Sequence, residues 1–567
     1  MAFRENSSQQ LNWGDSTLSL TRREFERLQD SWAADFAEMI FPYINEARFA
    51  VLYSENGATR PNTPVNFTFA LLLIKEMLRL TDEELYDQVL FNTQIQYALH
   101  TTSLEEQPIS DRTLSRFRER CYSYELETGT DLIHDETVAL AARIQAAMGV
   151  SGHIKRMDSL MVDISSRNMS RLQLFWRIVK GAVLEASRDA DMAEKLTGTL
   201  RGYLEDSDRS DDIGYRLKDE EVGEKLQTLM EDAVALRELL PEGAEARQAF
   251  RVLLRLLEEQ TDKADDGVVT LKEGKSIGAD SLQSAVDEDA TYREKAGEKH
   301  RGYVGNVLEA TDDNGSVIVD YDLAPNITSD IQFSKDVISN LGEKNGSGDP
   351  DERTDTLITD GAYASAETVE LAEDAGMELV SGTLAGRDTN PAIAEFAVDG
   401  ETGEVLACPA GQAPTSSGYD ADAGTHCAHF STEACAGCPM RDVCISKEQK
   451  KSFVVRFSDK QLIRAEQQKK AESEEYQILV DKRNGVEGMP SVLRRKYGVD
   501  QIPVKGLVRR KFWFGMKIGA INVKRLVASR KNRRNDGGNS PCPAFSGNVL
   551  VLLRRQFGCV LPLFRAA

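Results

Sequence analysis

The chain has 567 residues, of which 41% are hydrophobic, enough for several domains and a large core. No stretch approaches the roughly 18 to 20 consecutive apolar residues of a membrane span, and the start has no apolar signal core, so we expect a cytoplasmic protein without a membrane partner. A net charge of −23 excludes a protein whose whole surface coats nucleic acid. Basic residues nevertheless dominate from Arg494 onward, which predicts a local phosphate-binding surface.

The first 150 residues are predicted to form a helical DNA-binding region. An apolar stretch over 67–80 is followed by a capping pattern that opens the next helix. Farther along, Ser110 or Asp111 can cap a short helix whose arginines recur every four residues and therefore share one face. A helix-turn-helix reader needs such a face, although an ordinary solvated surface helix is the alternative. The arginines are Arg112, Arg116 and Arg120.

Two aspartates are associated with predicted strands. Residues 153–164 alternate as a strand does, with Asp158 inside it, and a charge there is costly to bury unless it is paired or binds a cation. The apolar pair Leu357-Ile358 leads into Asp360 and Gly361, as an interior strand of an α/β sheet would. Ligands gather at the carboxyl ends of such strands, although an Asp-Gly pair also forms plain turns.

The order of elements predicts the fold class. The Asp158 strand is followed by a long helical block without evident chemistry, a hairpin turning at Asn314-Gly315, a helix, the Asp360 strand, a helix and a further strand. We predict an α/β protein with a ribonuclease H-like mixed sheet flanked by helices, an all-α N-terminal region, a helical insertion and a small Cys-rich insert. In that arrangement the first and fourth strands lie side by side and bring the two aspartates together.

A third carboxylate carries a family resemblance. Arg483, Glu487 and Arg494 are separated by three and six residues, which resembles the Tyr-Arg-Glu-Lys signature of DDE-type insertion-sequence transposases. Val480 stands at the tyrosine position, and Arg494 replaces the lysine. The resemblance implies that Asp158, Asp360 and Glu487 are the catalytic, metal-binding triad.

The resemblance also implies the reaction. Two Mg²⁺ or Mn²⁺ ions would serve DNA cleavage at element ends and strand transfer into target DNA, with Arg483 and Arg494 holding phosphates. The partners would be double-stranded DNA, as terminal inverted repeats and target, and a second copy forming a homodimer in a prokaryotic cytoplasm. Two rival interpretations are an inactive or domesticated DNA-binding protein of the same fold and a nuclease that only hydrolyses. Gly488 and Pro490 predict that the Glu487 helix is interrupted, and Gly361 is expected to leave room for the scissile phosphate.

Five of the eight cysteines fall in one short region. A Cys-x2-Cys pair with further thiols nearby suits a tetrahedral structural Zn²⁺, whereas reduced cysteines packed in a small loop domain are the alternative. The predicted zinc ligands are Cys408, Cys435, Cys438 and Cys444, with Cys427, His426 and His429 as substitutes.

Cations and aromatic residues alternate near the end of the chain. Arg509, Arg510 and Lys511 precede Phe512, Trp513 and Phe514, a combination that can hold a DNA backbone and stack a base. We expect both phenylalanines in the core and the other four residues at the DNA.

The predicted division of the chain is the following: 1–150 helical DNA-binding region, 151–169 first part of the catalytic core, 170–268 helical insertion, 269–400 second part of the core, 401–450 Cys-rich insert, 451–530 final helical part with Glu487 and the basic segment, and 531–567 a tail without an assigned role.

Overall fold

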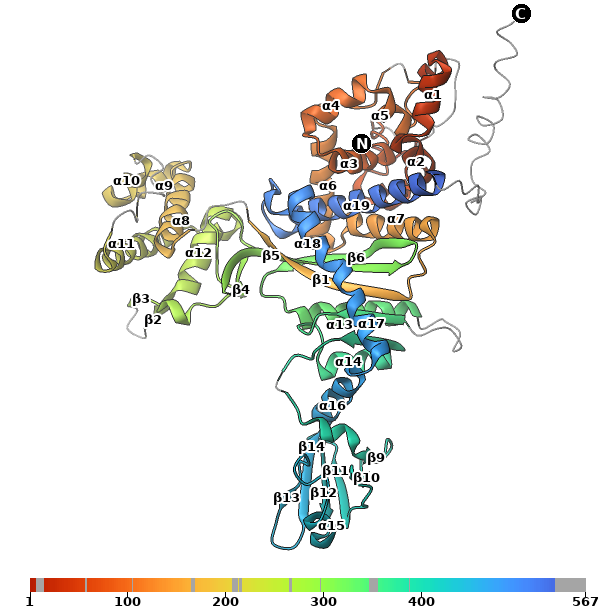
Figure 1. Ribbon diagram of the computed structural model, residues 1–567. Helices are drawn as coiled ribbons and strands as arrows, with labels where there is room; N and C mark the ends of the chain where they lie inside the picture. The colour runs from red at the N-terminus through yellow and green to blue at the C-terminus, as the bar shows by residue number, and fades with distance from the viewer. Residues whose placement is uncertain are drawn as a thin grey trace, which may run out of the picture.

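The computed structural model describes residues 1–6, 15–56, 59–104, 106–164, 169–205, 213, 217–264, 268–295, 297–345, 355–386 and 388–535. A central sheet lies where the other parts meet: the N-terminal helices on one side, a helical insertion projecting sideways and a β-rich insert at the far end (Figure 1). No helix within these ranges is both long and apolar enough to cross a membrane. The predicted tail beyond residue 535 lies outside the described residues.

The N-terminal region is helical, as predicted, and packs around the almost wholly buried α3. Thr81 begins α4 with a capping box to Glu84, which confirms the capping pattern. The basic helix α6 begins at Thr113 instead of nearer Ser110, and its N-cap residue Arg112 makes no side-chain cap bond. The helices are α1 (Arg22–Gln29), α2 (Trp32–Met39), α3 (Val65–Leu78), α4 (Asp82–Phe91), α5 (Thr93–Ala98), α6 (Thr113–Thr128) and α7 (Leu132–Met148).

The central sheet has the predicted ribonuclease H-like order. Its strands run β6-β5-β1-β7-β8, with β5 and β6 antiparallel to β1 and with β7 and β8 parallel to it. The strands are β1 (Ile154–Asp163), β5 (Glu298–Asp312), β6 (Gly315–Pro325), β7 (Asp355–Thr359) and β8 (Met377–Ser381). Alternating or apolar runs marked all of these in the sequence.

One strand of the central sheet was not predicted from the sequence. β4 (Thr291–Lys295) pairs with the beginning of β5, next to β6 on the same edge. Its residues are Thr-Tyr-Arg-Glu-Lys, so it has neither an apolar run nor a clear alternation.

The two faces of the sheet bury different helices. One face, with Met157 and Met161 of β1, packs against α13 (Asp330–Asn345) and α14 (Ala366–Asp374). The other face, with Leu160 and Val162, shares its core with α7 and the C-terminal helices. Side chains of a strand alternate between faces, so Asp158 lies on the second face.

The helical insertion lies between β1 and β4 and has a hydrophobic core of its own. Amphipathic stripes on α8 and α12 supply much of that core, as the periodic apolar residues predicted. Its elements are α8 (Arg171–Ala186), α9 (Ala190–Lys195), α10 (Gly198–Glu205), α11 (Asp219–Glu238), α12 (Gln248–Gln260), and the hairpin β2 (Thr261–Lys263) and β3 (Val269–Leu271).

The β-rich insert follows β8 and forms the far end of the molecule in Figure 1. A four-stranded sheet of order β11-β12-β14-β13 is its main element, and a short β9-β10 pair lies beside it. Its elements are β9 (Ala397–Val398), β10 (Val405–Ala407), β11 (Ser416–Asp420), β12 (Thr425–Phe430), α15 (Thr432–Ala436), β13 (Lys447–Glu448) and β14 (Phe453–Ser458).

The chain then returns to the central sheet through four helices, α16 (Asp459–Ala471), α17 (Glu474–Lys482), α18 (Asn484–Tyr497) and α19 (Leu507–Asn535). The prediction of an interrupted α18 was wrong, since Pro490 lies inside a continuous helix. An internal proline costs about 3 kcal/mol. Met489, Leu493 and Tyr497, four residues apart, bury one face of α18, and each such side chain contributes roughly 1.5 to 3 kcal/mol. Burial therefore outweighs the proline.

Candidate active site

Asp158 and Asp360 lie opposite each other on adjacent parallel strands. The β1–β7 register pairs Lys155 with Leu357 and Arg156 with Ile358. Continued by two residues, it sets Asp158 against Asp360, which directly follows β7. This is the juxtaposition that the element order predicted, and it puts two carboxylates at the carboxyl end of β7.

The two carboxylates differ in environment. Burial raises the pKa of Asp158 to about 6, although a hydrogen bond from the Ser159 backbone and the nearby cations Arg483 and Lys295 lower it. Asp360 is 56% exposed, and the Gly361 backbone N–H donates to its Oδ1 at 2.6 Å. Asp158 is therefore the enclosed member of the pair, and Asp360 is the one open to solvent.

Gly361 makes room for a protein side chain. A Cβ at this position would lie 2.0 Å from Oγ1 of Thr383, which belongs to the loop after β8. Any larger residue would have to displace Thr383. The close approach of Thr383 is therefore sufficient to explain the glycine. We had expected this space to be left for the scissile phosphate, but a protein side chain occupies it.

The segment with the third predicted carboxylate packs over this face of the sheet. Arg483 joins α17 to α18, and its Nη1 lies 3.6 Å from Oδ2 of Asp360. Glu487 is one turn farther along α18, which packs on β1. The side chain of Glu487 lies outside the described part of the structure.

A buried ion-pair network fixes the start of α18, and the sequence analysis missed it. Arg156 of β1 donates from Nε to Glu309 at 2.6 Å and from Nη1 to the carbonyl of Lys482 at 2.9 Å. The fully buried Glu309 also accepts from Arg525 of α19 at 2.5 Å. The strand that carries Asp158 is thereby tied to the junction before α18. No local pattern links residues so far apart in the sequence.

Arg494 lies at the other end of α18. Its Nη2 donates to the Met161 carbonyl at 2.6 Å, and its Nε lies 3.4 Å from Asp500. The side chain is 40% exposed. Arg494 therefore braces α18 against the end of β1 while part of the guanidinium faces solvent.

The predicted DNA-contacting residues of the N-terminal region lie at the surface. Arg112 and Arg116 are both exposed at the beginning of α6. Arg120, one turn farther along, instead stacks over Tyr53 at 4.6 Å. The exposed basic face is thus shorter than the spacing predicted.

The basic C-terminal segment is mostly interior, which corrects the expectation of DNA contact at Arg510 and Trp513. Arg510 is 1% exposed and faces the buried Asp287, whereas Trp513 is 4% exposed and lies beneath Lys75 and Arg118. A cation on a helix that is buried on most sides can be buried when a neighbouring element supplies a carboxylate to pair with it. Phe512 and Phe514 are buried as predicted.

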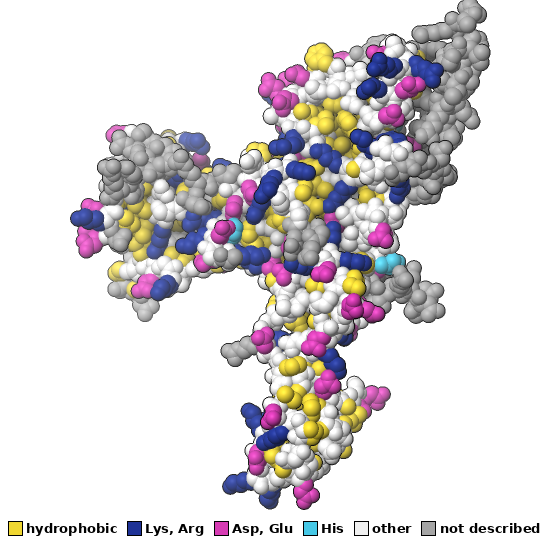
Figure 2. Space-filling model, viewed as in Figure 1, with side chains coloured by type: hydrophobic (Ala, Val, Ile, Leu, Met, Phe, Trp, Pro, Cys, Tyr) yellow, Lys and Arg dark blue, Asp and Glu magenta, His cyan; other side chains and the backbone are white. Residues whose placement is uncertain are grey.

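The remaining cations of this segment are partly accessible. Arg509 is 49% exposed and lies 3.6 Å from Glu119, and Lys511 is 29% exposed and lies 3.5 Å from Asp322. Figure 2 shows Lys and Arg side chains gathered where α18 and α19 cross the sheet. A basic surface exists here, but only part of the basic sequence contributes to it.

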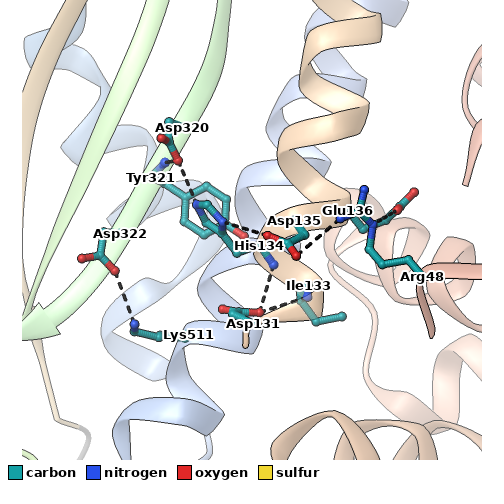
Figure 3. A network of polar contacts seen from close by, with 10 residues as sticks. All are labelled: Arg48, Asp131, Ile133, His134, Asp135, Glu136, Asp320, Tyr321, Asp322 and Lys511. Carbon is teal, nitrogen blue, oxygen red and sulfur yellow. Dashed lines mark hydrogen bonds and ion pairs between the residues drawn. The ribbon is translucent and has the colours of Figure 1, made fainter. Parts of the chain in front are cut away.

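A cavity of about 460 Å³ opens beside the edge strand β6. His134 of α7 is hydrogen-bonded to Asp320 at 2.8 Å, and Lys511 faces Asp322 (Figure 3). The Asp320 and Asp322 side chains also accept hydrogen bonds from the next backbone N–H along β6. These bonds occupy edge donors that could otherwise pair with another strand.

Metal-binding groups are limited among the described residues. No three His, Cys, Asp or Glu side chains there are already arranged as a metal site. Where β1 and β7 bring Asp158 and Asp360 together, the hard oxygens of these two carboxylates suit Mg²⁺ or Mn²⁺. The candidate active site thus consists of two carboxylates and the guanidinium of Arg483, a group that can bind a phosphate. Helix α18 packs over them.

Comparison with known proteins gives two family matches. Residues 22–120 match a transposase domain (DUF772), and residues 407–527 match a transposase DDE domain. No curated protein and no solved structure matches the chain. The first match covers α1 to α5 and the first half of α6, and the second includes the five cysteines of the β-rich insert, Arg483 and Glu487. With the ribonuclease H-like sheet between them, these domains support the identification of the chain as an insertion-sequence DDE transposase, which functions in DNA transposition.

Proposed function

We propose that the chain catalyses cleavage at the ends of its element and joins those ends to target DNA with Asp158, Asp360 and Glu487 as metal-binding residues. The observation that carries this proposal is the β1–β7 register, which when continued sets Asp158 beside Asp360, close enough that burial and then the Asp360 charge raise the pKa of Asp158. Arg483 beside Asp360 and the packing of the Glu487 helix on β1 support it.

Each residue has a distinct task in this proposal. Divalent cations would activate the attacking water or 3′-hydroxyl and stabilise the leaving oxygen, so no histidine base is required. The exposed Asp360 faces incoming DNA, and the enclosed Asp158 holds its place on β1. Arg483, whose guanidinium lies beside Asp360, would hold a phosphate of the DNA.

DNA binding outside the reaction centre is proposed for the accessible cations alone. These are Arg112 and Arg116 at the start of α6, Arg494 on α18, and Arg509 and Lys511 at the start of α19. The proposed substrate is double-stranded DNA with terminal inverted repeats, bound by a homodimer that pairs two ends.

The test is a cleavage and joining assay with the full chain. The DNA is a labelled duplex from the flanks of the reading frame, with a target plasmid, and Mg²⁺, Mn²⁺ or chelator. We expect metal-dependent strand cleavage at the repeat boundary, followed by joining. Ala substitutions of Asp158, Asp360 or Glu487 should reduce both products to background. Asp163→Ala, on the same strand but on the opposite face, is the matched control.

Two outcomes separate the rivals. Cleavage without joining would make the chain a nuclease that only hydrolyses. Specific binding with no cleavage in either metal would make it a DNA-binding protein that retains the fold. Full activity in a triad variant would contradict the residue assignment.

A further inference from the structure

Four cysteines of the β-rich insert line one small cavity. It measures about 20 Å³, roughly the space of one water molecule or ion. Three separate segments bring the thiols to it: the turn after β10, the short helix α15 and the loop that follows it. The lining cysteines are Cys408, Cys435, Cys438 and Cys444.

Three backbone turns present these cysteines. The Gly411 N–H donates to the Cys408 carbonyl at 2.8 Å, and Gly411 has a φ of +76° that favours glycine. The Cys438 N–H approaches the Cys435 carbonyl at 3.4 Å, and the Cys444 N–H donates to the Met440 carbonyl at 2.9 Å. Local backbone hydrogen bonds therefore position the cysteines. This observation does not depend on the reaction proposed above.

The walls of the cavity suit a soft cation. Phe430 and Val455, each 1% exposed, form an apolar wall, and Arg441 stacks over Phe453 at 4.2 Å beside the thiols. Carboxylates are absent from the residues that line it. Thiolates around a divalent cation leave net negative charge, which the Arg441 guanidinium offsets.

The connection that carries three of the four thiols has little regular structure. Between β12 and β13, residues 431–446 contain only the five-residue α15 as regular structure. Connections of this length without much regular structure are uncommon in compact domains unless something fixes them. A cation bound to thiols before, within and after α15 would do so.

We propose that Cys408, Cys435, Cys438 and Cys444 bind one structural Zn²⁺. Four thiolates in tetrahedral arrangement are a common structural zinc set, and the metal would link the β10 turn to the α15 segment. As placed, the thiols surround the cavity without converging on a single point. Binding thus requires them to turn inward, which a cysteine does by rotation about its one side-chain torsion.

Metal analysis of the full chain, purified under reducing conditions without chelator, tests the proposal. We expect one zinc per chain, and Co²⁺ substitution should give the visible absorption of a tetrahedral cobalt–thiolate complex. Cys438→Ser should lose most of the metal and that absorption. Cys427→Ser is the matched control, because Cys427 belongs to the same insert but lies near Arg456 and outside the cavity lining.

A second measurement keeps the proposal testable if Cys438→Ser fails to fold. A mercurial thiol reagent added to the folded wild-type chain should release zinc in step with modification of four thiols. Metal-free protein that takes up neither Zn²⁺ nor Co²⁺ would overturn the proposal, as would an iron–sulfur absorption spectrum or disulfides among the four cysteines. None of these readouts depends on DNA cleavage.

Discussion

Arg483, before α18, and the arginines of α19 face different partners. Arg483 lies 3.6 Å from the half-exposed Asp360 at the candidate active site. Arg510 faces the buried Asp287, and Arg530 and Arg534 both pair with Asp35 of the N-terminal region, which is 1% exposed. Most of the positive charge of α19 therefore joins parts of the chain, and less of it is available to DNA than the sequence suggests.

The largest expected effect is on stability, at the buried Glu309 that pairs with Arg525 of α19. Glu309→Gln leaves Arg156 and Arg525 without their shared buried carboxylate, so we expect a loss of about 3 to 5 kcal/mol in the free energy of unfolding. Denaturant unfolding measures it. Glu378→Gln, at an exposed position of β8, is the control and should stay within about 0.5 kcal/mol of wild type. Equal stability of the two variants would mean that the network does not hold the core.

Arg483→Ala should affect the reaction more than the fold. Loss of a cation beside the scissile phosphate is expected to slow cleavage by roughly 10- to 100-fold, or about 1.4 to 2.8 kcal/mol, with the free energy of unfolding nearly unchanged. Single-turnover cleavage measures the rate. Arg495→Ala, at an exposed position of α18, is the matched control. An unaltered rate in Arg483→Ala would place this arginine outside the reaction centre.

Glu125, near the cavity beside β6, predicts a pH effect on stability. Burial and then Asp131 raise its pKa to about 8 from an ordinary 4.5, so the folded state holds a proton that the unfolded state releases. Stability should fall as pH rises from 4.5 through 8. Glu125→Gln should remove the part of this loss that Glu125 causes, about 1 kcal/mol for a partly solvated group.

His134 contributes to the same pH dependence. Burial is the largest single influence and lowers its pKa, but the hydrogen bond with Asp320 and the charges of Asp320, Asp131 and Asp135 together raise it above the ordinary value. The stabilisation from His134 is therefore likewise lost as pH rises. The contribution of Glu125 is measured by thermal unfolding of wild type and Glu125→Gln at pH 5 and pH 9. The variant should gain stability at pH 9 and not at pH 5. A gain of equal size at both pH values would point to a cause other than titration.

The smallest effect is expected at α6. Arg116→Ala removes one exposed cation, so the slope of log K against log salt for DNA binding should fall by about 1 while stability stays within about 0.5 kcal/mol. Salt titration of binding measures it. Arg23→Ala, exposed on α1, should leave the slope unchanged. Identical slopes in both variants would remove α6 from the DNA-binding surface.

Local patterns predicted the sheet well and long-range pairing poorly. The strands that carry or flank Asp158 and Asp360 have apolar or alternating residues, and their order predicts the juxtaposition of the two aspartates. β4 has no such pattern because its polar residues cover a sheet edge. Arg510 and Trp513 were predicted to lie at the surface because the residues that bury them come from distant segments of the chain. The continuity of α18 depends on tertiary burial that outweighs Pro490.

The central claim is that Asp158, Asp360 and Glu487 bind the same cations. Fe²⁺ in place of Mg²⁺, with ascorbate and peroxide, cuts a polypeptide next to the bound ion, and the fragments locate its ligands. The account predicts cuts near residues 158, 360 and 487 together, all suppressed by excess Mg²⁺ and all lost in Asp158→Asn. Cuts confined to the two strands, with none near residue 487, would contradict it.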